Sequence, residues 1–338
     1  MNIDFVIPWV DGGDPAWQEE KWRYRGSSEN REDDRDARYR DWDELKFWFR
    51  GVEKFAPWVN RIFFITNGQL PGWLNLAHSR LKWVKHEDYI PPEYLPTFSS
   101  HPIELNLHRL DGLSENFVYF NDDTFLTAPV SERDFFRNGL PCALAIESPV
   151  TADSNDIFHH ILLNNSALLN RRYTRADFRK NAGWKRFSPA DPKGLITNAA
   201  MGVLRRDSFF GFHYFHLPSP LLKSTLRAVW KDEAEELDRV CRHRFRSVSD
   251  VNQYIFLERQ YVTGQFTPYP VRRNGFAFHL DDTDTDRNNI RQCCEAIRNQ
   301  KYKMICVNES NVLHFEETKK QINEAFEQIL PEKSSFER

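Results

Sequence analysis

The strongest local signal for chemistry in this sequence is a pair of adjacent carboxylates at the end of an apolar run. The run FVYF begins at Phe117 and leads directly into Asn121, Asp122 and Asp123. Two neighbouring carboxylates repel each other unless a cation or hydrogen-bond donors compensate their charge. Mg²⁺ often binds one or two carboxylates together with substrate phosphates. The segment therefore indicates a metal and diphosphate site, with an Asx turn or a helix cap as the structural alternative.

A turn with two glycines is the second candidate. Asp11 is followed by Gly12 and Gly13, shortly after the first apolar run of the chain. Glycine lets a backbone approach a ligand closely, so Asp11 could bind a ribose, a base or a metal. A tight turn without a ligand is the simpler interpretation of the same residues.

A basic cluster is the third candidate. Arg242, Arg244 and Arg246 lie close in sequence to Asp250 and Asn252. A guanidinium group matches two phosphate oxygens with parallel hydrogen bonds, so the cluster could clamp a phosphate. Taken alone, a solvated helix face explains it as well.

Other motifs carry less information. His216, in FHLPSPLLKS, is one of eleven histidines, and a single histidine is more often structural than catalytic. The acidic run at 281–286 lacks the downstream glycine and glutamate of an EF-hand, so a solvated turn that caps the next helix is expected. No GxGxxG, GxxxxGK[ST] or GxSxG motif occurs, which weakens readings as a dehydrogenase, a P-loop enzyme or an α/β-hydrolase.

These residues need a scaffold, and the first 125 or so residues predict an α/β core. Buried strands are expected at 3–7, 61–66, 81–84 and 117–120, and helices at 41–55 and from a serine cap at 99 or 100 to 110. Alternation of this kind predicts a mainly parallel sheet. Ligands collect at the carboxyl ends of such strands, where Asp11, Asn67, Gln69 and Asn121–Asp123 are expected.

The second half of the chain has a more helical pattern. Helices are expected at 157–170, 220–242, 251–261, 287–299 and 312–329, with a strand at 304–307. The predicted organisation is an α/β nucleotide-sugar-binding core at 1–150, a mostly helical lobe at 151–300 that completes the active site, and a strand and helix at 301–330 that return to the core. Residues 26–40 are expected to form a mobile loop, and residues 331–338 a frayed tail.

Composition excludes several classes of protein. The 338 residues include 46 Lys and Arg against 49 Asp and Glu, a formal charge of −3, so the basic excess of a nucleic-acid-binding protein is absent. No basic segment precedes a long apolar stretch at the N-terminus, and no window approaches the roughly 18 apolar residues of a membrane span. The five cysteines include no CxxC pair, which favours reduced thiols in the cytoplasm.

Taken together, the motif-bearing segments resemble the Stealth family of sugar-1-phosphate transferases. The resemblance rests on six segments in the family's order, spanning nearly the whole chain: IDFVIPWVDGGDPAW (Ile3–Trp17), Arg40–Asn75, Leu95–Leu126, FHLPSPLLKS (Phe215–Ser224), RFRSVSDVNQY (Arg244–Tyr254) and, less closely, ICVNES (Ile305–Ser310). It implies a Rossmann-like (GT-A-like) sheet and the transfer of hexose 1-phosphate from a UDP-sugar to an acceptor hydroxyl, with release of UMP.

The resemblance also implies roles for individual residues. Asp122, Asp123, His216 and Arg246 would be catalytic, and Asp122 and Asp123 would hold Mg²⁺ or Mn²⁺. Which carboxylate acts as base and which as ligand stays open, and His216 is the alternative base. The residues expected to bind substrate are Trp9, Asp11, Arg40, Asp43, Asn67, Gln69, His101, Arg109, Asn121, Asp250 and Asn252.

The expected partners follow from the same resemblance. They are a UDP-sugar donor and an oligosaccharide, polysaccharide or lipid-linked glycan acceptor, in the synthesis of a surface or capsular polysaccharide. The protein is expected in the cytoplasm, peripherally at the inner face of the membrane. The alternatives are a glycosyltransferase that releases UDP and a non-catalytic carbohydrate-binding protein.

Overall fold

The computed structural model describes residues 1–25, 40–151, 157–189, 191–283 and 288–338. The predicted mobile loop at 26–40 lies outside the described residues except for Arg40, and so does the acidic run from residue 284 onward. Among the described residues, no helix is both long and apolar enough to cross a membrane.

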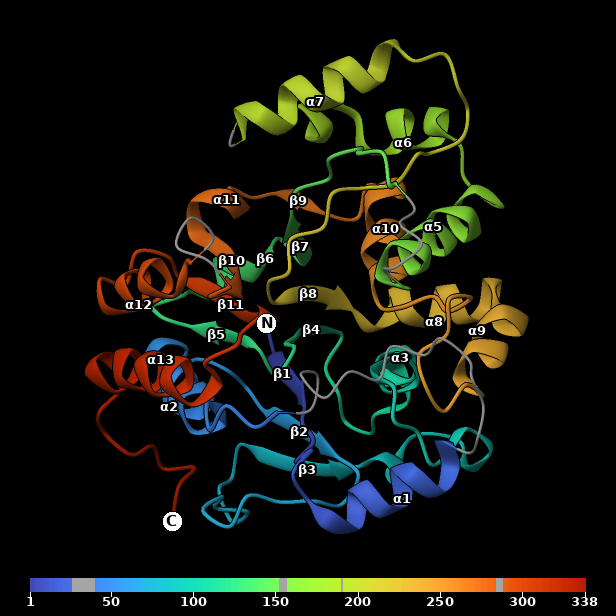
Figure 1. Ribbon diagram of the computed structural model, residues 1–338. Helices are drawn as coiled ribbons and strands as arrows, with labels where there is room; N and C mark the ends of the chain where they lie inside the picture. The colour runs from blue at the N-terminus through green and yellow to red at the C-terminus, as the bar shows by residue number, and fades with distance from the viewer. Residues whose placement is uncertain (26–39, 152–156, 190, 284–287) are drawn as a thin grey trace.

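The central sheet has five strands in the order β3-β2-β1-β4-β8 (Figure 1). Its first four strands run parallel, while β8 pairs antiparallel with β4. They are β1 (Ile3–Pro8), β2 (Ile62–Thr66), β3 (Leu81–Lys85), β4 (Asn116–Tyr119) and β8 (Ser219–Leu222). The predicted α/β class with a mainly parallel sheet is confirmed, and so are the four predicted strands of the first half.

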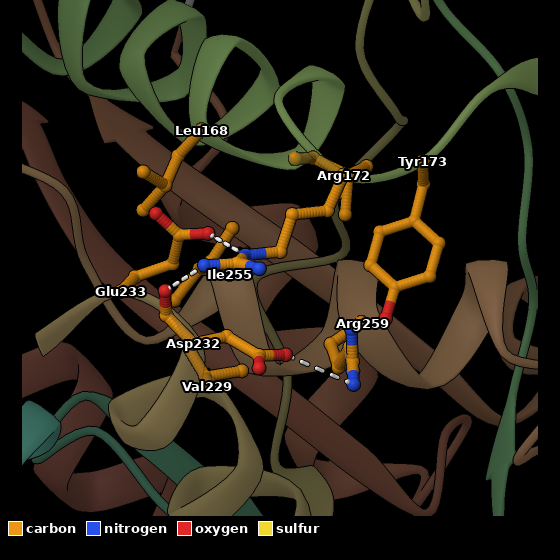
Figure 2. A pocket seen from close by; sticks show the side chains of 9 residues that line it. Leu168, Arg172, Tyr173, Val229, Asp232, Glu233, Ile255 and Arg259 are labelled. Carbon is orange, nitrogen blue, oxygen red and sulfur yellow. Dashed lines mark hydrogen bonds and ion pairs between the residues drawn. The ribbon is translucent and has the colours of Figure 1, made fainter.

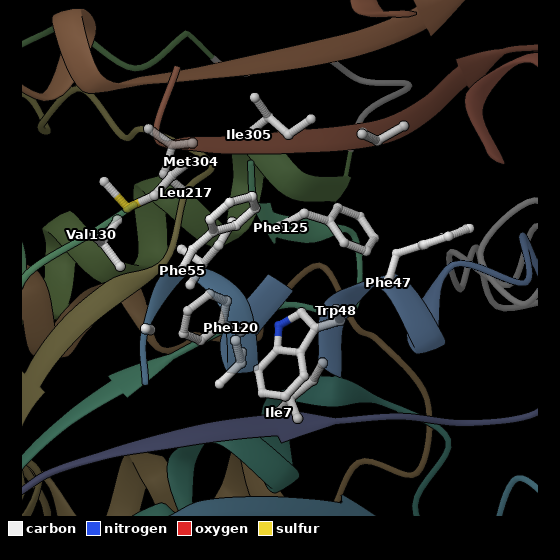
Figure 3. Packing of buried hydrophobic residues seen from close by; sticks show 14 of the residues in the cluster. Ile7, Phe47, Trp48, Phe55, Phe120, Phe125, Val130, Leu217, Met304 and Ile305 are labelled. Atoms are coloured by element: carbon white, nitrogen blue, oxygen red, sulfur yellow. The ribbon is translucent and has the colours of Figure 1, made fainter. Parts of the chain in front are cut away.

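Helices cover both faces of this sheet, which explains why its central strands are apolar throughout. In β1, Phe5 and Ile7 pack into one buried cluster and Val6 into the other. Figure 3 shows the first cluster, where Phe47 and Trp48 approach Phe120 and Phe125. The helices over that face are α2 (Leu45–Phe55), α12 (Ile290–Arg298) and α13 (Phe315–Ile329). Those over the opposite face include α3 (Ser100–Leu105), α8 (Lys223–Asp232), α9 (Ala234–Cys241) and α10 (Tyr254–Val262).

A second sheet brings the end of the chain back beside the end of β4. Its order is β10-β11-β5, with β5 antiparallel to β11. The strands are β10 (Gly275–Asp281), β11 (Met304–Asn311) and β5 (Thr124–Leu126). Because β5 begins directly after Asp123, this pairing places β11 against the acidic motif.

The remaining elements are short or lie farther from the central sheet. A third sheet contains β6 (Phe136–Arg137), β7 (Leu140–Ala143) and β9 (Thr267–Pro268). The other helices are α1 (Pro15–Arg25), α4 (Glu132–Phe135), α5 (Ile157–Asn170), α6 (Arg175–Ala182), α7 (Pro192–Val203) and α11 (Val271–Asn274). The 3₁₀ turns are η2 (His86–Asp88), η3 (Pro92–Tyr94), η4 (Leu107–Arg109) and η5 (Gly183–Phe187).

The predicted helix at 220–242 is wrong at its start. Residues 219–222 form β8, and the rest divides into α8 and α9 at Glu233. A short apolar run fits a buried strand as well as a buried helix, so periodicity could not separate them. Pro220 is tolerated because β8 is an edge strand with a single partner.

Two further predictions need correction. The helix expected from 99 to 110 ends at Leu105 and continues only as the 3₁₀ turn η4. The tail expected to be frayed is instead packed: Phe336 is fully buried, and Glu337 accepts hydrogen bonds from the Arg50 guanidinium at 2.9 and 3.0 Å. The apolar cluster beside α2 supplies the energy that orders these last residues.

Candidate active site

The acidic motif lies in the connection between the two main sheets. After β4 ends, the Thr124 backbone N–H and hydroxyl donate to the Asn121 carbonyl, at 3.1 and 2.7 Å. The Val307 N–H of β11 donates to the Asp123 carbonyl at 2.8 Å. The motif is therefore held on both sides by backbone hydrogen bonds at the carboxyl edge of the central sheet.

The two carboxylate oxygens of Asp123 have different surroundings. Oδ2 accepts hydrogen bonds from the Asn308 amide at 2.9 Å and from the Cys306 thiol at 3.3 Å. Oδ1 is buried and has no hydrogen-bond partner among the described residues. Nε2 of His216 lies 3.4 Å from it. The unpartnered oxygen is thus aimed toward His216.

His216 comes from the segment just before β8 and meets the motif through one ring nitrogen. Its Nε2 lies 2.8 Å from the side-chain amide of Asn121. Nε2 can accept from that amide or donate to Asp123, depending on the tautomer, but it cannot do both. With the Asn121 amide donating, the single lone pair of Nε2 is used, and Asp123 Oδ1 is the atom whose lone pairs stay open to a ligand.

Asp122 is partly accessible to solvent, yet protein atoms around its carboxyl group displace water from it. This desolvation and the nearby charge of Asp123 raise the pKa of Asp122 to about 7. The positive charge of Arg246 acts in the opposite direction and lowers that pKa. Arg246 itself donates to the hydroxyl of Ser100, at the start of α3, at 3.1 Å. The structure therefore brings all four predicted catalytic residues to one place.

Glu44, at the start of α2, adds a third carboxyl group. Its side chain is buried, and its Oε1 has no hydrogen-bond partner in the described part of the chain. Burial, followed by the charges of Asp123, Asp41 and Asp122, raises the pKa of Glu44 well above its ordinary value. The carboxyl groups of Asp122, Asp123 and Glu44 are therefore crowded around this edge of the sheet.

The donor atoms at this edge could hold a metal ion. Ligand atoms of Asp123, His216 and Cys306 lie within 4.8 Å of one another. Burial and the charge of Asp123 raise the pKa of the Cys306 thiol. The thiol therefore keeps its proton and donates a hydrogen bond to Asp123. Carboxylate oxygens and one imidazole nitrogen are therefore the available ligands.

His101 and Asp250 are buried beside the loop that carries Arg246. His101 Nδ1 is 2.8 Å from Asp250 Oδ2, and His243 Nδ1 is 2.6 Å from Oδ1. Burial opposes ionisation, but the hydrogen bonds from the two histidines lower the pKa of Asp250. Asp250 also accepts from the Ser247 N–H at 2.9 Å, so this cluster fixes the loop that carries Arg246.

Residues after β1 and β2 meet as predicted. The Asp11 N–H donates to the Gln69 side chain at 2.9 Å, and the Gln69 amide donates back to the Asp11 carbonyl at 3.0 Å. Asn67 is exposed and accepts from the Gln69 N–H at 3.4 Å. Trp9 and Asp11 line an open cleft of about 610 Å³.

Asp43 lines the same cleft, and Arg40 lies nearby. Asp43 Oδ2 is 2.6 Å from the Lys319 ammonium of α13, and this contact lowers the pKa of Asp43 against the effect of burial. Arg40 pairs with Glu309 at 2.8 Å, and its guanidinium stacks over Phe315. Both residues therefore join the segment before α2 to the C-terminal part of the chain.

Two predicted binding residues have contacts of another kind. Arg109 donates to Asn106 at 2.9 Å and lies over the Trp230 ring of α8. Asn252 is buried and exchanges hydrogen bonds with Asn165 of α5 at 2.8 and 3.1 Å. These contacts join helices, and none of them is with the acidic motif.

A small cavity of about 20 Å³ between α5, α8 and α10 is not a competing site (Figure 2). Its polar side chains neutralise one another: Arg172 pairs with Glu233, and Arg259 pairs with Asp232 at 3.2 Å. None of the predicted site residues lines it.

Sequence reasoning missed Glu44, Cys306 and Asn308. Glu44 lies at the polar start of the helix predicted at 41–55, where acidic residues are common and give no sign of a site. In β11, the alternation that buries Ile305 and Val307 in the core points Cys306 and Asn308 to the other side. That alternation was readable, but not the fact that β11 lies beside Asp123.

Comparison with families of known proteins gives two matches. The family model described as Stealth protein CR1, conserved region 1, matches residues 1–29. The one described as Stealth protein CR2, conserved region 2, matches residues 38–142 and so includes the acidic motif.

Full-length relatives are similar to this chain throughout. A receptor polysaccharide phosphotransferase, WefC of Streptococcus oralis, is 39% identical over all of both chains. A capsular polysaccharide phosphotransferase, WcwK of Streptococcus pneumoniae, is 40% identical over 100% of this chain and 99% of its own length. An exopolysaccharide phosphotransferase, cps2G of Lactiplantibacillus plantarum, is 32% identical over 100% and 97%. A crystal structure of the galactosyltransferase LgtC aligns over 95% of both chains, with 10% identity and a TM-score of 0.40.

Proposed function

The chain belongs to the Stealth family, whose full-length relatives are polysaccharide phosphotransferases, and from that premise we propose that it transfers hexose 1-phosphate from a UDP-sugar to a hydroxyl of an acceptor glycan. The products are UMP and a sugar phosphodiester in a surface or capsular polysaccharide. The acceptor is an oligosaccharide, a polysaccharide or a lipid-linked glycan.

One observation supports this chemistry above all others. Residues from three distant parts of the chain meet at one sheet edge: Asp122 and Asp123 after β4, His216 before β8, and Arg246 before α10. A diphosphate needs its charge neutralised and its phosphorus held in line with the attacking oxygen. Carboxylates for a cation, an imidazole and a guanidinium are the groups that this reaction requires.

A divalent cation fits the donor set. Asp123 Oδ1 is buried without a hydrogen-bond donor in the described part of the chain, and the carboxyl groups of Asp122 and Glu44 lie nearby. Asp122 and Asp123 would hold Mg²⁺ or Mn²⁺ through their carboxylate oxygens. When bound, such an ion neutralises the diphosphate and polarises its oxygens.

The chain's own residues then divide the remaining work. We assign the acceptor's proton to Nε2 of His216, with Asp123 at 3.4 Å stabilising the imidazolium that forms. Asn121 orients the same ring. The Arg246 guanidinium stabilises charge on the transferring phosphoryl oxygens. Attack at phosphorus leaves the anomeric configuration of the sugar unchanged.

We assign the residues after β1 and β2 to the binding of the UDP-sugar donor. Trp9, Asp11 and Gln69 lie at the carboxyl ends of two central strands, where nucleotides bind in sheets of this kind. We assign the protein to the cytoplasm, because all five cysteines are buried free thiols, as in a reducing compartment. Its place at the inner face of the membrane follows from the lipid-linked or growing glycan proposed as acceptor.

Product analysis tests the proposal. The enzyme is incubated with a panel of UDP-sugars, Mg²⁺ or Mn²⁺ and acceptor oligosaccharides, and the nucleotide is identified by mass spectrometry. UMP is expected, and its formation should stop when EDTA removes the ion. Release of UDP would instead identify a glycosyltransferase, and saturable glycan binding without turnover would identify a binding protein.

A further inference from the structure

Five of the twelve exposed large apolar side chains among the described residues lie in one stretch of the chain, between residues 184 and 204. Trp184 of η5 is 71% exposed, and Ile196 and Val203 of α7 are 67% and 79% exposed. Phe187 and Leu204, in the same stretch, are also exposed. Soluble proteins scatter single apolar residues over their surface, whereas a group of this kind marks an interaction site.

Helix α7 turns its apolar side away from the protein. Its inner stripe consists of Gly194, Asn198 and Met201, and Asn198 is fixed by hydrogen bonds to the Ala145 and Arg186 carbonyls at 2.8 and 2.7 Å. The opposite stripe follows helical spacing and carries no charge; it consists of Ile196, Ala199, Ala200 and Val203. A helix at the surface of a globular protein normally shows the reverse arrangement.

Basic residues flank this apolar stripe. Lys193 is exposed in the first turn of α7, and Arg205 and Arg206 are exposed directly after its end. The acidic groups nearby include the exposed Asp207 and three that are engaged within the protein: Asp191 pairs with Arg272, Glu147 pairs with Arg175, and Asp177 caps α6. The balance of charge around the stripe is therefore positive.

The position of α7 in the fold leaves this face open. Helix α7 lies at the outer end of the molecule, beyond α6 and far from the central sheet (Figure 1). We call the surface formed by Ile196, Ala199, Ala200, Val203 and the flanking Lys193, Arg205 and Arg206 the α7 face.

We propose that the α7 face binds to an anionic phospholipid bilayer, with α7 lying in the plane of the lipid headgroups. Interfacial helices combine an apolar stripe with basic flanks in this way, because apolar side chains enter the acyl boundary while basic groups contact lipid phosphates. A second copy of the chain is the poorer occupant, because a two-fold contact would bring the same basic residues face to face. This inference does not depend on the reaction proposed above.

Vesicle sedimentation with the full-length protein tests the inference. Vesicles of phosphatidylcholine with phosphatidylglycerol are compared with vesicles of phosphatidylcholine alone. We expect binding to the anionic vesicles that weakens with salt, and a partition coefficient lowered about tenfold or more by Ile196→Asp with Val203→Asp. Leu313→Asp is the matched control, because Leu313 is 69% exposed elsewhere on the molecule, and it should bind like the parent protein.

A second variant and two further readouts keep the outcome decisive. Lys193→Glu with Arg205→Glu should weaken binding without altering any packed side chain, and turnover of a soluble acceptor should be unchanged in every variant. Absence of binding to anionic vesicles, or equal loss in the Leu313→Asp control, overturns the inference. So does light scattering that shows a dimer in the parent protein and a monomer in the double variant, since the occupant would then be a second copy.

Discussion

Asp123 is held by its neighbours in one orientation. Asn308 and Cys306 occupy Oδ2, which leaves Oδ1 facing His216 without a donor of its own. A buried oxygen without a partner is unfavourable in isolation, and a ligand that contacts it recovers that free energy. The same arrangement therefore favours the binding of a cation at the point where the reaction is proposed.

His216 and Arg246 should be needed for turnover and not for folding. Both side chains are partly exposed and make few contacts, so His216→Ala and Arg246→Ala should each lower kcat by about 10²–10⁴-fold. Turnover is measured by UMP release and folding by circular dichroism. Near-normal turnover in both variants would remove the roles assigned to them.

Asn308 should act on the reaction through Asp123. Asn308→Ala removes the 2.9 Å hydrogen bond to Oδ2, lets the carboxylate rotate, and should lower kcat about tenfold with little change in the KM for the donor. Asn311→Ala is the matched control, because Asn311 lies on the same strand and binds Asp281 instead. An equal loss in both variants would point to damage to β11, not to the orientation of Asp123.

At the scale of elements, short connections place the chemistry. The turn from β4 to β5 is four residues long, and it joins the central sheet to the sheet of β10 and β11. Helix α3 and the loop before α10 meet where Ser100 binds Arg246. The site is therefore formed where separate elements end, which is typical of α/β proteins.

The C-terminal segment should contribute to stability. Phe336 is fully buried against Phe49, and Phe336→Ala should lower the free energy of unfolding by about 3–5 kcal/mol. Urea denaturation measures the change, with Phe276→Ala as the control because Phe276 is exposed. An effect no larger than that of the control would mean that the segment is not packed in solution.

At the scale of the whole molecule, buried carboxyl groups should make stability depend on pH. Burial raises the pKa of Glu258 in α10 to about 8, against an ordinary value of 4.5. Between these values the folded state keeps a proton that the unfolded state releases. Stability therefore falls as pH rises through this window, by roughly 1.4 kcal/mol per pH unit for this group.

Glu258→Gln should remove that contribution. Asp122 and Glu44, whose pKa values are also raised, remain in both proteins, so the variant should lose only part of the slope. The melting temperature is compared from pH 5.5 to 7.5, with Glu235→Gln on the exposed surface of α9 as the control. Parallel pH profiles of the parent and the Glu258→Gln protein would contradict the prediction.

Predictions from sequence succeeded where one local pattern had one physical solution. Apolar runs in the first half gave β1, β2, β3 and β4, because strands buried on both faces cannot carry polar residues. They failed where a short apolar run had two solutions, as at β8, and where distant contacts order a polar segment, as at Phe336. The division of the chain into the predicted domains stays a prediction.

The sequence by itself determined the α/β class, the family, and the acidic motif with its histidine and arginine, because local spacing and residue type are properties of the chain. Only the tertiary structure decided that Cys306 and Asn308 hold one oxygen of Asp123, that His101 and Asp250 stand behind Arg246, and that α7 faces outward. The physical reason is that hydrogen bonds and burial join residues from 95 to more than 180 positions apart, and no local pattern encodes which of them meet.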